Sequence, residues 1–195
     1  MPAYPLAPEH PFPTALNVVL QAYESLLGRY SPTDIMLAGD SAGGGLVCAA
    51  LFAAREIGLA MPSAIACFSP WTDLCGAPDH EIQSRTCAMF FAEHVPLTAE
   101  AYLGNHDPSD PLASPLWGDF SGFPATLIQV SRTEMLFSDS TRLFERMSDS
   151  GVRVELSIYD DLPHGWQMLA PWLPNAGRAL REAAQFLSGP PEAED

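Results

Sequence analysis

Ser41 lies in a Gly-x-Ser-x-Gly pattern formed by Gly39, Asp40, Ser41, Ala42 and Gly43, a pattern that exposes a nucleophilic serine on a tight turn. The run before this elbow is apolar and strand-like, and the run after it is typical of a helix. Small residues suit the turn because the serine needs a strained backbone, and side chains at Gly39 and Gly43 would collide with neighbouring backbone. We therefore predict that Ser41 is a nucleophile. The alternative is a glycine-rich turn that only begins a helix.

The helix expected after Ser41 begins at Ala42 and points its N-terminus at the serine. Free backbone N–H groups and the positive end of the helix dipole stabilise an oxyanion at such a position. The backbone N–H of Ala42 is therefore the predicted oxyanion donor.

A catalytic serine needs a base, and enzymes with this elbow place the acid and then the base after the serine in chain order. Of the five histidines, His164 meets that demand, on a loop that directly follows the last predicted strand. Such loops gather at the carboxyl ends of parallel strands, where active sites form. We predict that His164 is the general base. The other four precede any acid in this order and are interpreted as surface or hydrogen-bonded residues: His10, His80, His94 and His106.

The acid is expected after the strand that precedes the helix at residues 138–150. Two carboxylates are available there, Glu134 and Asp139. Glu134 comes first after the strand, whereas Asp139 is placed to cap or begin the helix. A glutamate orients and stabilises an imidazolium as well as an aspartate does. Glu134 is therefore the predicted acid, with Asp139 as the alternative.

Short β-rich runs alternate with helical patterns along the chain, which predicts an α/β fold with a parallel sheet and flanking helices. The expected strands are apolar on both faces where they lie deepest; they cover residues 34–38, 64–69, 125–131 and 152–159. The expected helices cover residues 13–28, 42–57, 98–103, 138–150 and 175–187. A long stretch over residues 72–123 is otherwise irregular, as functional segments often are.

The composition fits one domain, residues 1–188, followed by an acidic tail at residues 189–195. With 9 basic and 24 acidic residues, the formal charge is −15, which argues against nucleic acid and anionic membranes as partners. No stretch is apolar enough for a membrane-spanning helix, and no secretory leader is recognised, so we expect a cytoplasmic protein. The four cysteines show no metal or disulfide spacing, and we expect no cofactor.

Several motifs together resemble the bacterial hormone-sensitive-lipase-like esterases, also called family IV carboxylesterases, of the α/β-hydrolase fold. Residues 4–13 (Tyr-Pro-Leu-Ala-Pro-Glu-His-Pro-Phe-Pro) and 39–44 (Gly-Asp-Ser-Ala-Gly-Gly) resemble family segments, as do residues 69–74 and 110–116. In the family the acid is followed by one residue and then by Leu, which matches Glu134-Met135-Leu136. The resemblance implies hydrolysis of small-molecule esters with short acyl chains, without a cofactor.

The chain also departs from that family. Family members carry a His-Gly-Gly-Gly oxyanion segment, a cap and further strands upstream of the segment that corresponds to residues 4–13, and these are not recognised here. We therefore expect a partial sheet in which the strand before Ser41 is an edge. This edge would then be covered by self-association, by the stretch at residues 1–10 or by a missing N-terminal segment. This chain alone is expected to be a poor esterase.

The leading hypothesis is thus a serine carboxylesterase that works through an acyl-enzyme. Two alternatives stand beside it: a catalytically impaired fragment, and a non-catalytic small-molecule-binding module on the same fold. The presence of His164 favours the enzyme over the binding module. A serine peptidase with the same order of residues is disfavoured by the motif at residues 4–13.

Overall fold

Four parallel strands form the centre of this computed structural model, which describes residues 1–76, 87, 89 and 93–189. Neighbouring strands in the sheet are also neighbours in the sequence, in the order β1-β2-β3-β4. Their bounds are β1 Met36–Asp40, β2 Ala64–Phe68, β3 Ala125–Ser131 and β4 Val154–Tyr159. This arrangement confirms the predicted α/β fold with a partial parallel sheet, since each strand is joined to the next by a segment that crosses back over the sheet.

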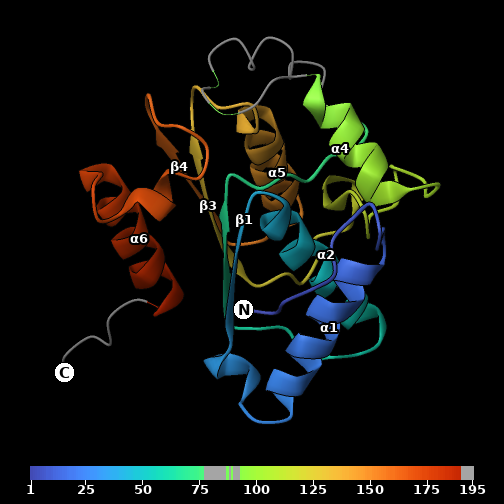
Figure 1. The fold of residues 1–195 in the computed structure, drawn as a ribbon. Coiled ribbons are helices and arrows are strands. Elements are labelled where there is room, and N and C mark those ends of the chain that lie inside the picture. Colours follow the sequence, from blue (N-terminus) through green and yellow to red (C-terminus); the bar gives the residue numbers. More distant parts are fainter. Residues whose placement is uncertain (77–86, 88, 90–92, 190–195) are drawn as a thin grey trace, which may run out of the picture.

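Helices cover both faces of the sheet (Figure 1). One side carries α6, whereas α1, α2 and α5 lie on the other. The helices are α1 Thr14–Leu27, α2 Ala42–Glu56, α4 His94–Leu103, α5 Phe137–Asp149 and α6 Pro174–Leu187. Three short 3-10 turns complete the described elements: η1 Pro32–Asp34, η2 Pro115–Trp117 and η3 Trp166–Leu169.

The alternation of side chains along the inner strands explains the two helical layers. On β2, Ile65 and Cys67 face the large core cluster with residues of α2 and α5, whereas Ala66 faces α6. On β3, Ile128 belongs to the first cluster and Leu127 to the second. Both faces of β2 and β3 are therefore buried, as a parallel sheet between helices requires.

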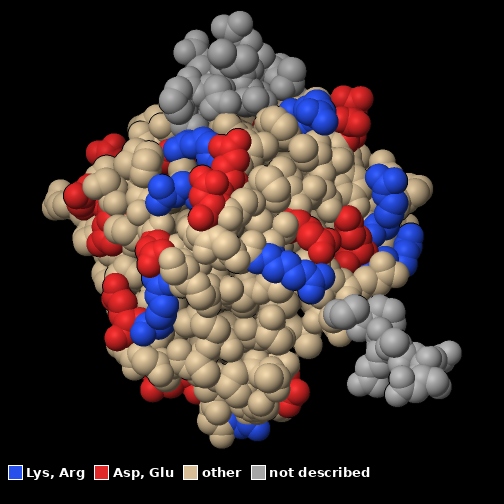
Figure 2. Space-filling model, turned by 180° about the vertical axis from the view of Figure 1, so that it is seen from behind, with Lys and Arg blue, Asp and Glu red and all other residues tan. Residues whose placement is uncertain are grey.

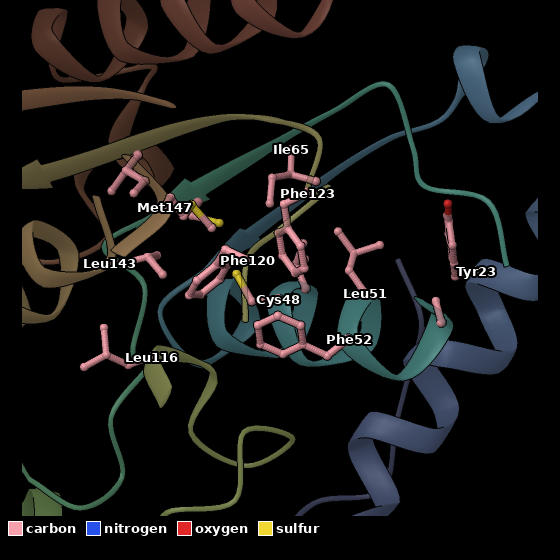
Figure 3. Close-up of a cluster of buried hydrophobic side chains, with 14 of the residues drawn as sticks. Tyr23, Cys48, Leu51, Phe52, Ile65, Leu116, Phe120, Phe123, Leu143 and Met147 are labelled. Carbon is pink, nitrogen blue, oxygen red and sulfur yellow. The ribbon is translucent and has the colours of Figure 1, made fainter. Parts of the chain in front are cut away.

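The main core also contains residues from the irregular segment between α4 and β3 (Figure 3). Phe120 and Phe123 pack against Phe52 of α2, with ring centroids 5.1 and 4.8 Å away. Aromatic pairs at this spacing stabilise a core beyond the area they bury. This packing anchors the otherwise irregular chain between α4 and β3 to the sheet layer.

Most predicted elements occur, with bounds that differ by a few residues. The strand before Ser41 begins at Met36 rather than residue 34, because η1 ends at Asp34 and the strand continues through Asp40. Helix α4 begins at His94 rather than residue 98, since Pro96 lies in its first turn, where a missing N–H is tolerated. Part of the long segment (77–86, 88 and 90–92) and the tail from residue 190 lie outside the described residues.

β1 differs from the inner strands in burial. It pairs with β2 on one side, and no described strand pairs with its other side. Met36 is 44% exposed, and the remaining residues of β1 are exposed or half-buried. The expected edge is therefore present among the described residues, and the residues of β1 are more exposed than those of β2 and β3.

The surface carries acidic and basic side chains close together on the face shown in Figure 2. There they form no continuous basic area of the kind that binds a polyanion. Within the described residues, no helix is long and apolar enough to span a bilayer.

Candidate active site

Ser41 lies on a strained elbow between β1 and α2. Its φ of 55° and ψ of −123° are unusual for a residue with a side chain, and such strain concentrates at functional sites. Two backbone hydrogen bonds hold it there: Ser41 N–H donates to Phe68 O at 2.8 Å, and Trp71 N–H donates to Ser41 O at 3.0 Å. The end of β2 therefore fixes the elbow.

Glycines let α2 approach the elbow and the segment after β2. A Cβ on Gly39 would lie 2.2 Å from Gly43 O, so a side chain there collides with backbone as expected. The same expectation is wrong for Gly43, where a Cβ would meet nothing within 4 Å because its site is open. Instead, Gly44 and Gly45 are constrained, since their Cβ atoms would lie 2.8 Å from Pro70 Cβ and 2.3 Å from Trp71 O.

His164 and Glu134 form a buried pair across the ends of β4 and β3. His164 Nδ1 lies 2.5 Å from Glu134 Oε2. The histidine is 6% exposed and the glutamate is fully buried. A carboxylate at Nδ1 fixes the ring orientation and tautomer, leaving Nε2 to exchange a proton with a nucleophile.

The other oxygen of Glu134 is held by two donors. Its Oε1 accepts the Ser131 backbone N–H at 2.7 Å and the Ser69 hydroxyl at 2.6 Å. A buried carboxylate requires such partners because desolvation penalises its charge. Glu134 is therefore held in the orientation that points Oε2 at His164.

Asp139, the alternative acid, serves a different segment. It lies in the first turn of α5, and its Oδ1 accepts the backbone N–H groups of Thr72 and Asp73 at 3.2 and 3.1 Å. Of the two predicted placements, capping the helix or beginning it, the second holds, since the described start of α5 has no side-chain cap bond. The carboxylate instead ties the segment after β2 to α5, because two buried N–H groups there need an acceptor.

Asp40 links the elbow to the histidine loop. A Cβ on Gly165, the residue after His164, would lie 4.0 Å from Asp40 Oδ2. Burial raises the pKa of Asp40, the nearby His164 opposes that rise, and Glu134 adds to it. The residue before Ser41 is thus close enough to His164 for their charges to interact.

A small apolar cavity of about 180 Å³ opens at Ser41 and Ala42. As the first residue of α2, Ala42 has no intrahelical acceptor for its N–H. The remaining wall of the cavity is formed mainly by Trp71, Val95, Thr98, Met135 and Leu136, with His94 at its margin. A group bound at Ser41 would therefore meet mostly apolar side chains.

A second cavity of about 290 Å³ adjoins the first, because Ala42, Trp71 and Thr98 line both. Residues 4–7, which begin the segment that resembles the family, form another part of its wall. The N-terminal stretch therefore lies beside the beginning of α2, and it forms no described strand along β1.

Comparison with known proteins matches residues 1–168 to a family described as "alpha/beta hydrolase fold". The chain belongs to this family. The crystal structure of an esterase from the bacterial hormone-sensitive lipase family superimposes with a TM-score of 0.91 at 42% identity, over 94% of this chain and 63% of that one. Another esterase structure, from a crystal soaked with p-nitrophenyl butyrate, has a TM-score of 0.90 at 38% identity, over 94% and 63% of the two chains.

Curated relatives of this chain carry related descriptions. An acetyl-hydrolase of Streptomyces hygroscopicus is 39% identical over 94% of this chain, and an esterase of Acinetobacter venetianus is 34% identical over 94%. The chain spans 62% and 61% of the lengths of these two relatives. The homologues are esterases and acetyl-hydrolases, so this chain is of a hydrolase enzyme family.

The remaining histidines of the chain lie in varied surroundings. His106 Nε2 pairs with Asp110 Oδ2 at 2.6 Å, and His10 lines the larger cavity. His94, which was interpreted as a surface or hydrogen-bonded residue, is exposed and lines the smaller cavity together with Ser41. His80 lies outside the described residues. No cluster that could hold a metal ion occurs among the described residues, and Cys48 and Cys67 are buried free thiols.

No role was predicted for Ser69 from the sequence, although its hydroxyl donates to Glu134 in the structure. Ser69 is the first residue after β2, just as Ser41 is the first after β1. Position at a strand's carboxyl end was therefore a usable signal. Its partner lies 65 residues away, and that pairing follows from the sheet register rather than from any local pattern.

Proposed function

We propose that the chain is a serine carboxylic ester hydrolase with Ser41 as nucleophile, His164 as general base and Glu134 as acid. The observation that carries this proposal is the buried His164–Glu134 pair at 2.5 Å, beside the elbow that bears Ser41. These groups follow β4, β3 and β1, whose carboxyl ends lie along one edge of the sheet. That edge is where open α/β sheets place their reacting groups.

In the proposed reaction, Ser41 Oγ attacks the carbonyl carbon of the ester while His164 Nε2 accepts the hydroxyl proton. The carbonyl oxygen becomes an oxyanion, which the Ala42 N–H and the start of α2 stabilise. Collapse of this intermediate breaks the bond to the alcohol, which takes the proton from His164. Water then attacks the acyl-enzyme by the same route and releases the acid. Glu134 stabilises the imidazolium in both halves.

Short acyl chains are the proposed substrate class. The cavity at Ser41 is about 180 Å³ and mostly apolar, so it suits a small acyl group without charge. The similar proteins include an acetyl-hydrolase and EstE5, a protein whose crystal was soaked with p-nitrophenyl butyrate. These likenesses support the proposal that acetyl and butyryl esters are preferred over long-chain esters.

The test is hydrolysis of p-nitrophenyl acetate, butyrate and decanoate by the chain, Ser41→Ala and Glu134→Gln. Butyrate should be cleaved faster than decanoate, and Ser41→Ala should be inactive. Glu134→Gln should lose about 10³–10⁴ in kcat, because the ring is no longer held in the productive tautomer beside an anion. Equal rates for wild type and Ser41→Ala would contradict the proposed nucleophile.

A catalytically impaired chain is the second candidate, favoured by the open flank of β1 and by Ala42 as the single oxyanion donor that we assign. Losing one oxyanion donor costs about 10²–10³ in kcat in a well-studied case. An exposed strand flank also presents unpaired N–H and C=O groups. We propose that a second copy or an upstream segment pairs with β1 in the active enzyme.

Light scattering and ester hydrolysis distinguish these states. We expect this chain to associate and to turn over slowly, compared with a version extended upstream through a His-Gly-Gly-Gly segment. A monomeric short chain that matches the extended version in turnover would contradict the need for a covered β1. Absence of hydrolysis by both versions would contradict the esterase proposal itself.

A further inference from the structure

Ser69 occupies a buried position next to the proposed acid. It is the first residue after β2, it is fully buried, and its hydroxyl donates to Glu134 Oε1 at 2.6 Å. Hydrogen bonds to ionised acceptors are shorter and about twice as strong as neutral ones. The hydroxyl is therefore placed to act on the charge of Glu134.

The backbone of Ser69 is strained. Its φ is 44°, and the only other non-glycine residues with positive φ among the described ones are Ser41 and Asp161. All three lie within two residues of the carboxyl end of a strand. Such strain persists when surrounding contacts impose it, and it concentrates at functional sites. At Ser69, the backbone N–H donates to Gln129 O of β3 at 2.7 Å, which helps to hold the conformation.

The contacts of Glu134 divide between its two oxygens. Oε1 is occupied by Ser131 N–H and the Ser69 hydroxyl, and Oε2 is 2.5 Å from His164 Nδ1. Rotation of the carboxylate would break both bonds to Oε1. Two donors on Oε1 also withdraw negative charge from Oε2, so they set how strongly the carboxylate attracts the Nδ1 proton.

We infer that Ser69 is a positioning residue that acts through Glu134, fixing its carboxylate and tuning its hold on His164. This inference rests on the proposed function for its catalytic consequence. Ser69 directly follows β2. The carboxyl end of β2 otherwise contributes no residue to the proposed catalytic group. The geometry thus links the carboxyl ends of β2, β3 and β4 through hydrogen bonds to Glu134.

Ser69→Ala removes the hydroxyl, and Ser140→Ala is the matched control. Ser140 is also fully buried, but its hydroxyl has no hydrogen-bond partner among the described residues. Ser69→Gly is a second variant, which removes the hydroxyl and relaxes the positive φ. It keeps the test usable if Ser69→Ala does not fold.

Two readouts separate positioning from general stability. The first is the proton NMR resonance of His164 Nδ1–H, identified by its loss in His164→Gln, which needs no turnover. We expect it to move downfield in both Ser69 variants, since Oε2 gains negative charge, and to stay in place in Ser140→Ala. The second is p-nitrophenyl butyrate hydrolysis, where Ser69→Ala should lower kcat about tenfold with KM within about twofold.

An unchanged resonance in a folded Ser69 variant would overturn the inference, whether or not the chain hydrolyses esters. A kcat loss shared equally by Ser140→Ala would do the same, because it would reflect general destabilisation. If neither the wild-type chain nor its upstream-extended version hydrolyses an ester, the proposed function fails and the resonance alone decides the role of Ser69.

Discussion

Asp139→Ala removes the acceptor of two buried backbone N–H groups, those of Thr72 and Asp73. The carboxylate is fully buried, so water cannot simply replace it. A buried donor left without a partner costs about 1–3 kcal/mol, which predicts a loss of about 2–6 kcal/mol in the free energy of unfolding. That is a large part of the 5–15 kcal/mol that stabilises a typical domain, and it corresponds to a fall of about 10 °C in Tm.

Asp139→Asn is the matched control because its amide oxygen still accepts at the same position. We expect it to lose less than half as much stability. Urea unfolding followed by tryptophan fluorescence measures both changes, and butyrate hydrolysis is then compared under conditions where each variant is folded. Glu134→Gln serves as the reference for loss of the acid.

We expect the kcat of folded Asp139→Asn to stay within about tenfold of the wild-type kcat, far above the kcat of Glu134→Gln. If folded Asp139→Asn were as inactive as Glu134→Gln, Asp139 would be the acid and our assignment would be wrong. An unchanged unfolding free energy in Asp139→Ala would refute the structural role that we derive from its two bonds.

Two further predictions concern the elbow and the alkaline limit of stability. Gly39→Ala should abolish activity and destabilise the fold, because its Cβ would lie 2.2 Å from Gly43 O, whereas Gly43→Ala should fold normally. Circular dichroism melting of both variants measures this difference in stability. Equal melting points would contradict the prediction. Burial raises the pKa of Tyr23, Tyr102 and Tyr159 to about 12. The folded state binds these phenol protons more tightly than the unfolded state, so the free energy of unfolding should fall as pH rises from about 10 through 12. Phenolate absorbance that develops well before the chain unfolds would contradict this prediction.

The elbow and the sheet could be predicted because their signals are local. A strand, a glycine turn with serine and a helix follow one another directly, and the order of acid and base follows from chain position. The bounds of β3, residues 125–131, were also predicted as the structure has them, from a short β-rich run that contains Leu127, Ile128 and Val130.

The roles of Ser69, Gly45 and Asp139 could not be read in this way. Each depends on a contact between segments that the fold brings together: Ser69 with Glu134, Gly45 with Trp71 O, and Asp139 with Thr72. Sequence spacing does not report which backbone groups a buried carboxylate will meet. The open site at Gly43 was missed for the same reason, since a glycine in a motif does not by itself reveal which neighbours crowd it.

Fluorophosphonate labelling followed by peptide mapping tests the proposed nucleophile most directly. The reagent reacts with serines that a neighbouring base activates, so it reports the state of the site even when turnover is slow. We predict one adduct, on the peptide that contains Ser41. This adduct should be lost in Ser41→Ala and strongly reduced in His164→Gln. A folded chain that takes up no label, or that is labelled at another serine, would contradict it.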